Sequence, residues 1–136
     1  MRNHKILMIV EDDADDRLYF SDAVKEIDAA NECIEAWNGV QALKLLHKLT
    51  QLPDFIFIDI NMPLMNGLDC LEKLKEDEKL KNIPVIIYTT SQYQENSDYT
   101  RELGAAYFIT KPIDTKQLPQ LIISAMEKAT QNKHHQ

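Results

Sequence analysis

Acidic side chains stand at the ends of two short apolar runs, and their placement is the first sign of chemistry in this sequence. Residues 55–58 run into Asp59, and residues 6–10 run into Glu11 and Asp12. Short continuous apolar runs predict strands that are buried on both faces, as in a parallel sheet. Because open α/β sheets place their ligand sites at the carboxyl ends of the strands, we expect these carboxylates to lie close together.

Carboxylates gathered in one crevice repel one another and raise one another's pKa values unless a cation is present. Mg²⁺ prefers oxygen ligands and usually binds through a few carboxylates together with a substrate phosphate. Glu11, Asp12 and Asp59 therefore form a candidate magnesium site. The alternative for Glu11 and Asp12 is a plain acidic helix start, since acids at residues 12–16 would favour the helix dipole. The third carboxylate, Asp59, comes from a different strand and weakens that alternative.

Two further apolar runs end in groups that could hold a phosphate. Residues 84–88 run into Thr89, and residues 105–110 run into Lys111 and Pro112. Lys111 offers a compact positive charge suited to a phosphate oxygen, and the hydroxyl of Thr89 could donate a hydrogen bond to another. Each residue alone is commonplace, because Lys before Pro is usually a loop residue and Thr often ends a strand. Their order at successive strand ends is what indicates a shared site.

These residues match, in order, the motifs of response-regulator receiver domains of two-component signalling. The segments 61–63 (Asn-Met-Pro) and 65–67 (Met-Asn-Gly) complete the match, and the chain resembles the family over nearly its whole length. The resemblance implies a flavodoxin-like, doubly wound (βα)5 fold of the α/β class, with a five-stranded parallel sheet in the order 2-1-3-4-5. We expect a receiver domain over residues 1–129 and a flexible polar tail over 130–136. With no output domain expected, the chain resembles a stand-alone, chemotaxis-type regulator.

The resemblance implies that Asp59 accepts a phosphoryl group from a histidine kinase or a histidine phosphotransfer protein, with Mg²⁺ as cofactor. Glu11, Asp12 and Asp59 would then be metal ligands, joined by the backbone carbonyl of Asn61. Glu11 departs from the family pattern, because many relatives carry Asp there. We expect the longer side chain to reach the metal, through a water molecule where needed.

By the same resemblance, Thr89 and Lys111 would hold the phosphoryl oxygens. Phe108 would be the aromatic side chain whose inward or outward position reports activation. The peptide bond between Lys111 and Pro112 would be cis, which is unusual even before proline. Thr90 stands where a smaller residue is commoner, and its bulk could change the lifetime of the phosphoryl group.

The implied function is signalling rather than enzymatic, since such a domain assists only its own phosphorylation and dephosphorylation. One alternative is a docking module that works without phosphorylation, against which the intact set of Asp59, Thr89 and Lys111 argues. A second is a magnesium-dependent phosphatase with an Asp nucleophile. Such enzymes usually need a second acid two residues after the nucleophile, and here that residue is Asn61.

Composition agrees with one small domain that works through protein partners. The chain has 136 residues, 44% of them hydrophobic, which suffices for a single core. With 15 basic and 22 acidic residues the net charge is −7, which argues against DNA or an anionic membrane as a partner. No apolar run is long enough for a signal peptide or a membrane span, so we expect a cytoplasmic protein.

Cys33 and Cys70 lack the spacing of a metal-binding motif, and we expect both to be reduced core residues. Trp37 is assigned only a packing role.

Helical periodicity fills the stretches between the apolar runs. Leucines at three-residue steps follow Asn38-Gly39 and Asn66-Gly67, which predicts helices that begin at these pairs.

Ser91 with Gln94 resembles a capping box that opens a helix over about residues 92–103. By family resemblance this helix, the strand that carries Phe108 and the last helix form the partner face. A homodimer through the last two helices and the fifth strand would use the same face.

Overall fold

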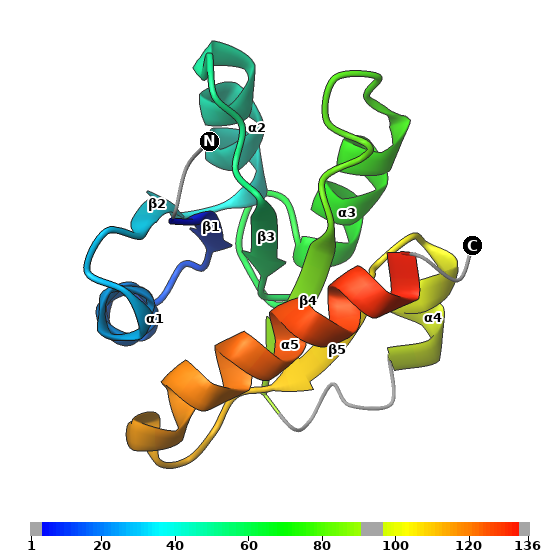
Figure 1. The fold of residues 1–136 in the computed structure, drawn as a ribbon. Helices are drawn as coiled ribbons and strands as arrows, with labels where there is room; N and C mark the ends of the chain where they lie inside the picture. Colours follow the sequence, from blue (N-terminus) through cyan, green and yellow to red (C-terminus); the bar gives the residue numbers. More distant parts are fainter. Residues whose placement is uncertain (1–3, 91–96, 134–136) are drawn as a thin grey trace.

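The computed structural model describes residues 4–90 and 97–133, and these form five helices around one five-stranded parallel sheet. The strand order is β2-β1-β3-β4-β5 (Figure 1), which confirms the doubly wound α/β fold expected from the resemblance. The strands are β1 (Ile6–Val10), β2 (Glu32–Ala36), β3 (Phe55–Ile58), β4 (Val85–Thr89) and β5 (Tyr107–Thr110). The helices are α1 (Ala14–Ile27), α2 (Gly39–Lys48), α3 (Gly67–Glu76), α4 (Ser97–Glu102) and α5 (Leu118–Lys133), with a short 3₁₀ turn, Thr115–Gln117, before α5.

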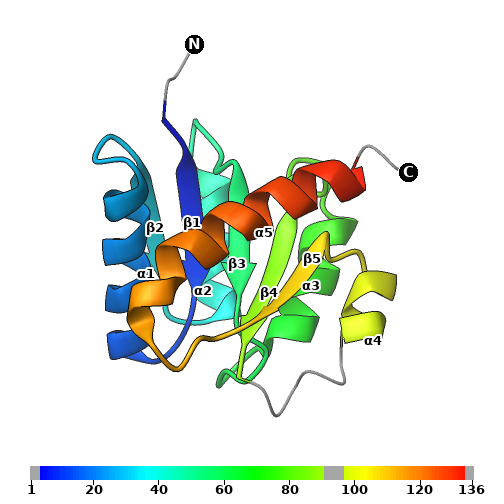
Figure 2. The same ribbon diagram turned by 60° about the horizontal axis from the view of Figure 1, so that its bottom comes forward.

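Helices cover both faces of the sheet, with α1 and α5 on one face and α2 and α3 on the other (Figure 2). Strands β1, β3 and β4 are buried along their whole length, as their continuous apolar runs predict. Along each of these strands, successive side chains point to opposite faces of the sheet and so join two different apolar cores. In β1, Leu7 and Ile9 join the core under α1 and α5, while Met8 and Val10 join the core under α2 and α3. With both faces covered, the strand ends are the part of the sheet that can carry a site.

Short polar residues begin the three helices that follow β1, β2 and β3. Asn38 and Asn66 are the N-caps of α2 and α3, and each side chain accepts a hydrogen bond from the backbone N–H three residues later, at 2.9 and 3.0 Å. The helix starts predicted from the Asn-Gly pairs are therefore confirmed. Asp13 caps α1 in the same way and accepts from the N–H of Asp16 at 3.0 Å.

The C-terminal half differs in part from the prediction. Helix α5 continues to Lys133, so helical structure extends into the segment 130–136 that we expected to be a flexible tail. The hydroxyl of Thr130 donates to the carbonyl of Met126 at 2.9 Å, within that helix. Residues 134–136 lie outside the described residues, as do Ser91 and Gln94 of the predicted capping box.

The cysteines agree with their predicted role, and Trp37 is more exposed than a core residue. Cys70 is buried, Cys33 is half-buried, and both are free thiols. Burial raises the pKa of each thiol to about 12, so both stay protonated and unreactive at neutral pH. Trp37 is 56% exposed and lies outside the core, and its ring centre lies 6.0 Å from Cζ of Arg17. It follows the last residue of β2, where the chain leaves an edge strand of the sheet.

Leu64, in the loop between β3 and α3, has a left-handed backbone with φ of 69°, and its side chain is 86% exposed. This conformation costs a residue with a branched side chain about 1 kcal/mol, and Asn tolerates it better. We expect Leu64→Asn to raise the free energy of unfolding by about 0.5–1 kcal/mol in urea titrations.

The matched control is Ile113→Asn, because Ile113 is also fully exposed in a loop but has no positive φ. We expect it to change the free energy of unfolding by about 0.5 kcal/mol or less. Equal gains from both variants would show that loss of an exposed apolar side chain, rather than relief of the backbone, explains the effect.

Candidate functional site

The ends of four strands bring the predicted site residues to one edge of the sheet. Backbone pairing continues one residue past the strands, since the N–H of Glu11 donates to Ala36 at 3.0 Å and that of Asp59 donates to Val10 at 3.0 Å. On the other side, the N–H of Lys111 donates to the carbonyl of Thr89 at 2.7 Å. The sheet itself therefore fixes where these side chains start.

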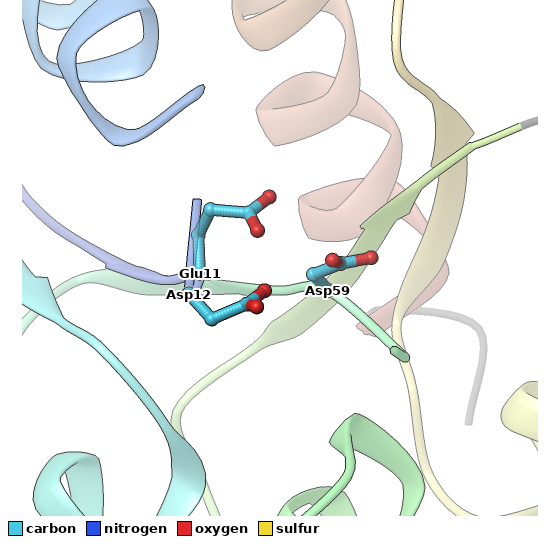
Figure 3. Close-up of side chains that lie close together, drawn as sticks. All are labelled: Glu11, Asp12 and Asp59. Atoms are coloured by element: carbon cyan, nitrogen blue, oxygen red, sulfur yellow. The ribbon is translucent and has the colours of Figure 1, made fainter. Parts of the chain in front are cut away.

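Glu11, Asp12 and Asp59 form an acidic group at this edge (Figure 3). Each offers a carboxylate oxygen, and these oxygens lie within 4.8 Å of one another. Glu11 is 1% and Asp59 5% exposed, whereas Asp12 faces solvent. Oxygen donors grouped in this way suit a hard divalent cation, so the chemistry of the donor set fits a metal site. Asn61, whose carbonyl was predicted as a further ligand, is exposed beside them, and its role stays a prediction.

Thr89 and Lys111 meet the two oxygens of the Asp59 carboxylate from β4 and β5. The fully buried Thr89 hydroxyl donates to Asp59 Oδ1 at 2.6 Å. Lys111 Nζ lies 3.6 Å from Asp59 Oδ2, and it donates more closely to Glu11 Oε1 and, at 2.8 Å, to Asp16 Oδ2. A hydroxyl and an ammonium thus flank the one carboxylate that the sequence places at the end of β3.

The Lys111–Pro112 peptide bond is trans, since the described residues contain no cis peptide. The cis bond predicted from the resemblance is therefore wrong. The trans form is the intrinsically preferred one, even before proline, by about 0.5–1 kcal/mol. In this arrangement the ammonium of Lys111 contacts Glu11 and Asp16 more closely than Asp59.

Burial and the neighbouring charges shift the pKa values of Glu11 and Lys111. Burial raises the pKa of Glu11 to about 8; the hydrogen bond from Lys111 opposes this shift, and the charge of Asp59 adds to it. For Lys111, burial alone would lower the pKa, but hydrogen bonds to Asp16 and Glu11 hold it above its ordinary value. The ammonium therefore stays charged, while burial keeps the Glu11 carboxyl group protonated to a higher pH than usual.

The raised pKa of Glu11 predicts how the stability of the metal-free protein depends on pH. Glu11 ionises near 4.5 in the unfolded chain and near 8 in the folded protein. Between these values the folded state binds more protons, so the free energy of unfolding should fall as pH rises from 4.5 to about 8. Urea titrations across this range should give a flatter dependence for Glu11→Gln, while Asp12→Asn, at an exposed position, should keep the slope. An unchanged slope in Glu11→Gln would assign the pH dependence to other groups.

Two residues of α1 belong to the site although the sequence argument did not single them out. Asp16 contacts Lys111, as described above, and Arg17 binds the segment that carries the acids. The guanidinium of Arg17 donates to the carbonyls of Glu11 and Asp12 at 2.8 and 3.1 Å. Its Cζ lies 6.0 Å from the centre of the Trp37 ring. The positions of Asp16 and Arg17 in the first turn of α1 place both side chains at the site. From the sequence alone, Asp16 could equally be one of several acids that stabilise the start of a helix, so nothing singled it out.

The loop after Asp59 is held close to the site by Gly67. The N–H of Gly67 donates to the carbonyl of Ile60 at 2.8 Å. A Cβ at Gly67 would lie 2.2 Å from the carbonyl oxygen of Asp59, so only glycine allows this approach. The start of α3 therefore packs directly on the backbone that presents the Asp59 carboxylate.

Comparison with known proteins agrees with this geometry. The family model of the response regulator receiver domain matches residues 7–123. The chain is 33% identical to the polar-differentiation response regulator DivK of Brucella anthropi over 125 residues, which cover 92% of this chain and 98% of DivK.

Solved structures give the same result. The phosphorylated cyanobacterial phytochrome response regulator RcpA has a TM-score of 0.81 at 28% identity, with 91% of this chain and 92% of RcpA covered. The Mn²⁺-bound form of the response regulator Rcp1 has a TM-score of 0.76 at 26% identity, with 88% of this chain and 90% of Rcp1 covered. The family expected from the sequence motifs is thereby confirmed. This chain belongs to the response regulator receiver domain family of two-component signalling.

Proposed function

We propose that Asp59 accepts a phosphoryl group from a histidine kinase or a histidine phosphotransfer protein, and that the phosphorylated domain signals through protein contacts. The observation that supports this most strongly is the environment of the Asp59 carboxylate. It is 5% exposed, one oxygen accepts from Thr89 at 2.6 Å, and the other lies 3.6 Å from the ammonium of Lys111. A buried carboxylate needs such partners in any case, but here a hydroxyl and an ammonium from two further strand ends meet at the carboxylate that the sequence motifs single out, which places three groups suited to phosphoryl transfer together.

In the proposed reaction, an oxygen of the Asp59 carboxylate attacks the phosphorus of a phosphohistidine. An O–P bond forms, the N–P bond breaks, and the leaving imidazole nitrogen takes up a proton. Thr89 and Lys111 would stabilise the negative charge on the oxygens of the transferred group, because a fixed hydroxyl and an ammonium already lie beside the nucleophile. The chain would assist only its own phosphorylation and dephosphorylation and would not act as an enzyme on other molecules.

Glu11, Asp12 and Asp59 would hold Mg²⁺, together with the carbonyl of Asn61. The close oxygens of the acidic group support this, because they offer a hard divalent cation several donors at one place. When bound, Mg²⁺ would neutralise part of the negative charge that the carboxylates and the incoming phosphoryl group share. The solved Mn²⁺-bound form of the relative Rcp1 is consistent with a divalent cation in such a domain.

The response to phosphorylation would spread from Thr89 to β5. The Thr89 hydroxyl, now bound to Asp59, would turn to a phosphoryl oxygen, and Phe108 on β5, which is half-buried, would move into the space released. Phe108 also lines a small pocket between α4 and β5, together with Thr100 and Arg101, so its movement would alter that part of the surface. The surface of α4, β5 and α5 would then change and could bind a target or form a homodimer.

Charge and hydropathy bear on where the protein works. Within residues 4–90 and 97–133, no helix is long and apolar enough to cross a bilayer. The net charge of −7 opposes direct binding to DNA or to an anionic membrane. We propose that the protein works in the cytoplasm, because the proposed phosphoryl donor, a histidine kinase or a phosphotransfer protein, would act on it there.

The test is intact-mass spectrometry of the protein after incubation with phosphoramidate or acetyl phosphate, with Mg²⁺ or with a chelator. We expect one addition of about 80 Da, the mass of a phosphoryl group, in the presence of Mg²⁺ and none with the chelator. Labelling that is indifferent to the chelator would remove the metal role of Glu11 and Asp12. If neither these donors nor a histidine kinase labels the chain, the proposal fails and a docking module becomes the better interpretation.

A further inference from the structure

The contacts of Lys111 point to a second function for the first turn of α1. We propose that Asp16 is a positioning residue that holds the ammonium of Lys111 away from Asp59 before phosphorylation and thereby slows the reaction. This inference rests on the proposed role of Asp59 as phosphoryl acceptor and goes beyond it, because it assigns a regulating contact to a residue outside the predicted site.

The distances from the Lys111 ammonium to its three carboxylate partners support this proposal. Lys111 Nζ lies 2.8 Å from Asp16 Oδ2 and donates to Glu11 as well, but it lies 3.6 Å from Asp59 Oδ2, beyond an ordinary hydrogen bond. The Lys111 side chain is 12% exposed, and its ammonium lies among carboxylates and 5.5 Å from the centre of the Tyr88 ring. Its closest contacts are therefore with Glu11 and Asp16 rather than with the nucleophile, and of these two only Asp16 lies outside the acidic group.

Helix α1 holds Asp16 in place, which distinguishes it from a mobile surface acid. The backbone N–H of Asp16 donates to the capping carboxylate of Asp13 at 3.0 Å. The next residue, Arg17, binds the carbonyls of Glu11 and Asp12 and ties the same turn to the loop that carries the acidic group. The Asp16 carboxylate is thus presented to Lys111 from a rigid element, at 36% exposure of its side chain.

Two consequences follow if Asp16 is neutralised. Lys111 would shift toward Asp59, where it can stabilise the oxygens of the transferred group, so phosphorylation at saturating Mg²⁺ would become faster. The same shift would bring the ammonium closer to the carboxylate of Asp59, a proposed metal ligand, so the affinity for Mg²⁺ would fall. Both effects act through Lys111 and should be absent when that side chain is removed.

The experiment compares Asp16→Asn with Asp15→Asn, which removes the same charge from an exposed position in the same turn of α1. The rate of labelling by phosphoramidate at saturating Mg²⁺ should rise about three- to tenfold in Asp16→Asn and less than about twofold in Asp15→Asn. In a Lys111→Ala background, Asp16→Asn should give no more than the general charge effect of Asp15→Asn. Equal rates in Asp16→Asn and Asp15→Asn, or the full gain in the Lys111→Ala background, would overturn the proposal.

Calorimetric titration with Mg²⁺ provides a readout that needs no phosphorylation. Asp16→Asn should bind Mg²⁺ more weakly than Asp15→Asn, and this difference should vanish in the Lys111→Ala background. Equal Mg²⁺ affinities of the two single variants would count against the proposed position of Lys111. If no variant is labelled by any donor, the acceptor role of Asp59 fails, while this titration still decides whether Asp16 controls Lys111.

Discussion

Asp59→Asn is expected to abolish phosphoryl labelling while the protein stays folded. The amide has nearly the size of the carboxylate, and its oxygen can still accept from Thr89, which donates to Asp59 Oδ1 at 2.6 Å. It lacks the anionic oxygen that would attack phosphorus. The substitution also removes one negative charge from an acidic group whose oxygens lie within 4.8 Å of one another. We therefore expect a thermal midpoint no lower than that of the unmodified protein, measured by circular dichroism.

Intact-mass spectrometry with phosphoramidate and Mg²⁺ measures the loss of labelling directly. The control is Asp22→Asn, at an exposed position of α1 away from the acidic group, which should be labelled to the same extent as the unmodified protein. An addition that persists at full stoichiometry in Asp59→Asn would show that another residue accepts the phosphoryl group, and the assignment of Asp59 would be withdrawn.

Gly67→Ala is expected to give the largest loss of stability of any conservative change at the site. The new Cβ would lie 2.2 Å from the carbonyl oxygen of Asp59 and 2.8 Å from the Cα of Ile60. Both atoms belong to backbone that follows β3, so neither can rotate away. We expect the free energy of unfolding to fall by about 3 kcal/mol or more in urea titrations. Because the displaced backbone carries the Asp59 carboxylate, the folded fraction should also be labelled more slowly.

The matched control is Gly39→Ala, since Gly39 likewise follows an Asn cap at the start of a helix. There the new Cβ would first meet Met65 Sδ at 2.9 Å, near the end of a flexible side chain. Alanine also suits a helix better than glycine by about 1 kcal/mol, so we expect a net loss of about 1 kcal/mol or less. Similar losses in both variants would show that the helix start, rather than the contact with Asp59, explains the effect.

Strand ends and helix starts could be predicted from the sequence because local patterns determine them. Strands β1, β3 and β4 are continuous apolar runs that end in polar residues, and the structure buries them on both faces. Asn38 and Asn66 each precede a glycine and a helical repeat, and both are N-caps. The strand order needed more than pattern, since apolar runs do not say which strands are neighbours; it came from the family resemblance.

Contacts between side chains of distant segments could not be predicted in the same way. The pairing of Lys111 with Asp16 joins residues 95 positions apart and depends on how helix α1 sits over the strand ends. Four acids near the start of α1 all suit a helix N-terminus, so composition gave no reason to choose one of them. The exposure of Trp37 was missed for a related reason, because a large aromatic residue after a strand is more often buried than 56% exposed.

The contact between Arg17 and Trp37 should make the fluorescence of the indole ring sensitive to movements at the acidic group. Trp37 is the chain's single tryptophan, and its indole ring lies 6.0 Å from the Arg17 guanidinium that binds the carbonyls of Glu11 and Asp12. A shift of the segment that carries these acids would move a positive charge relative to the indole ring and change its emission. Events at the acidic group can therefore be followed by intrinsic fluorescence, without a label and with every residue in place.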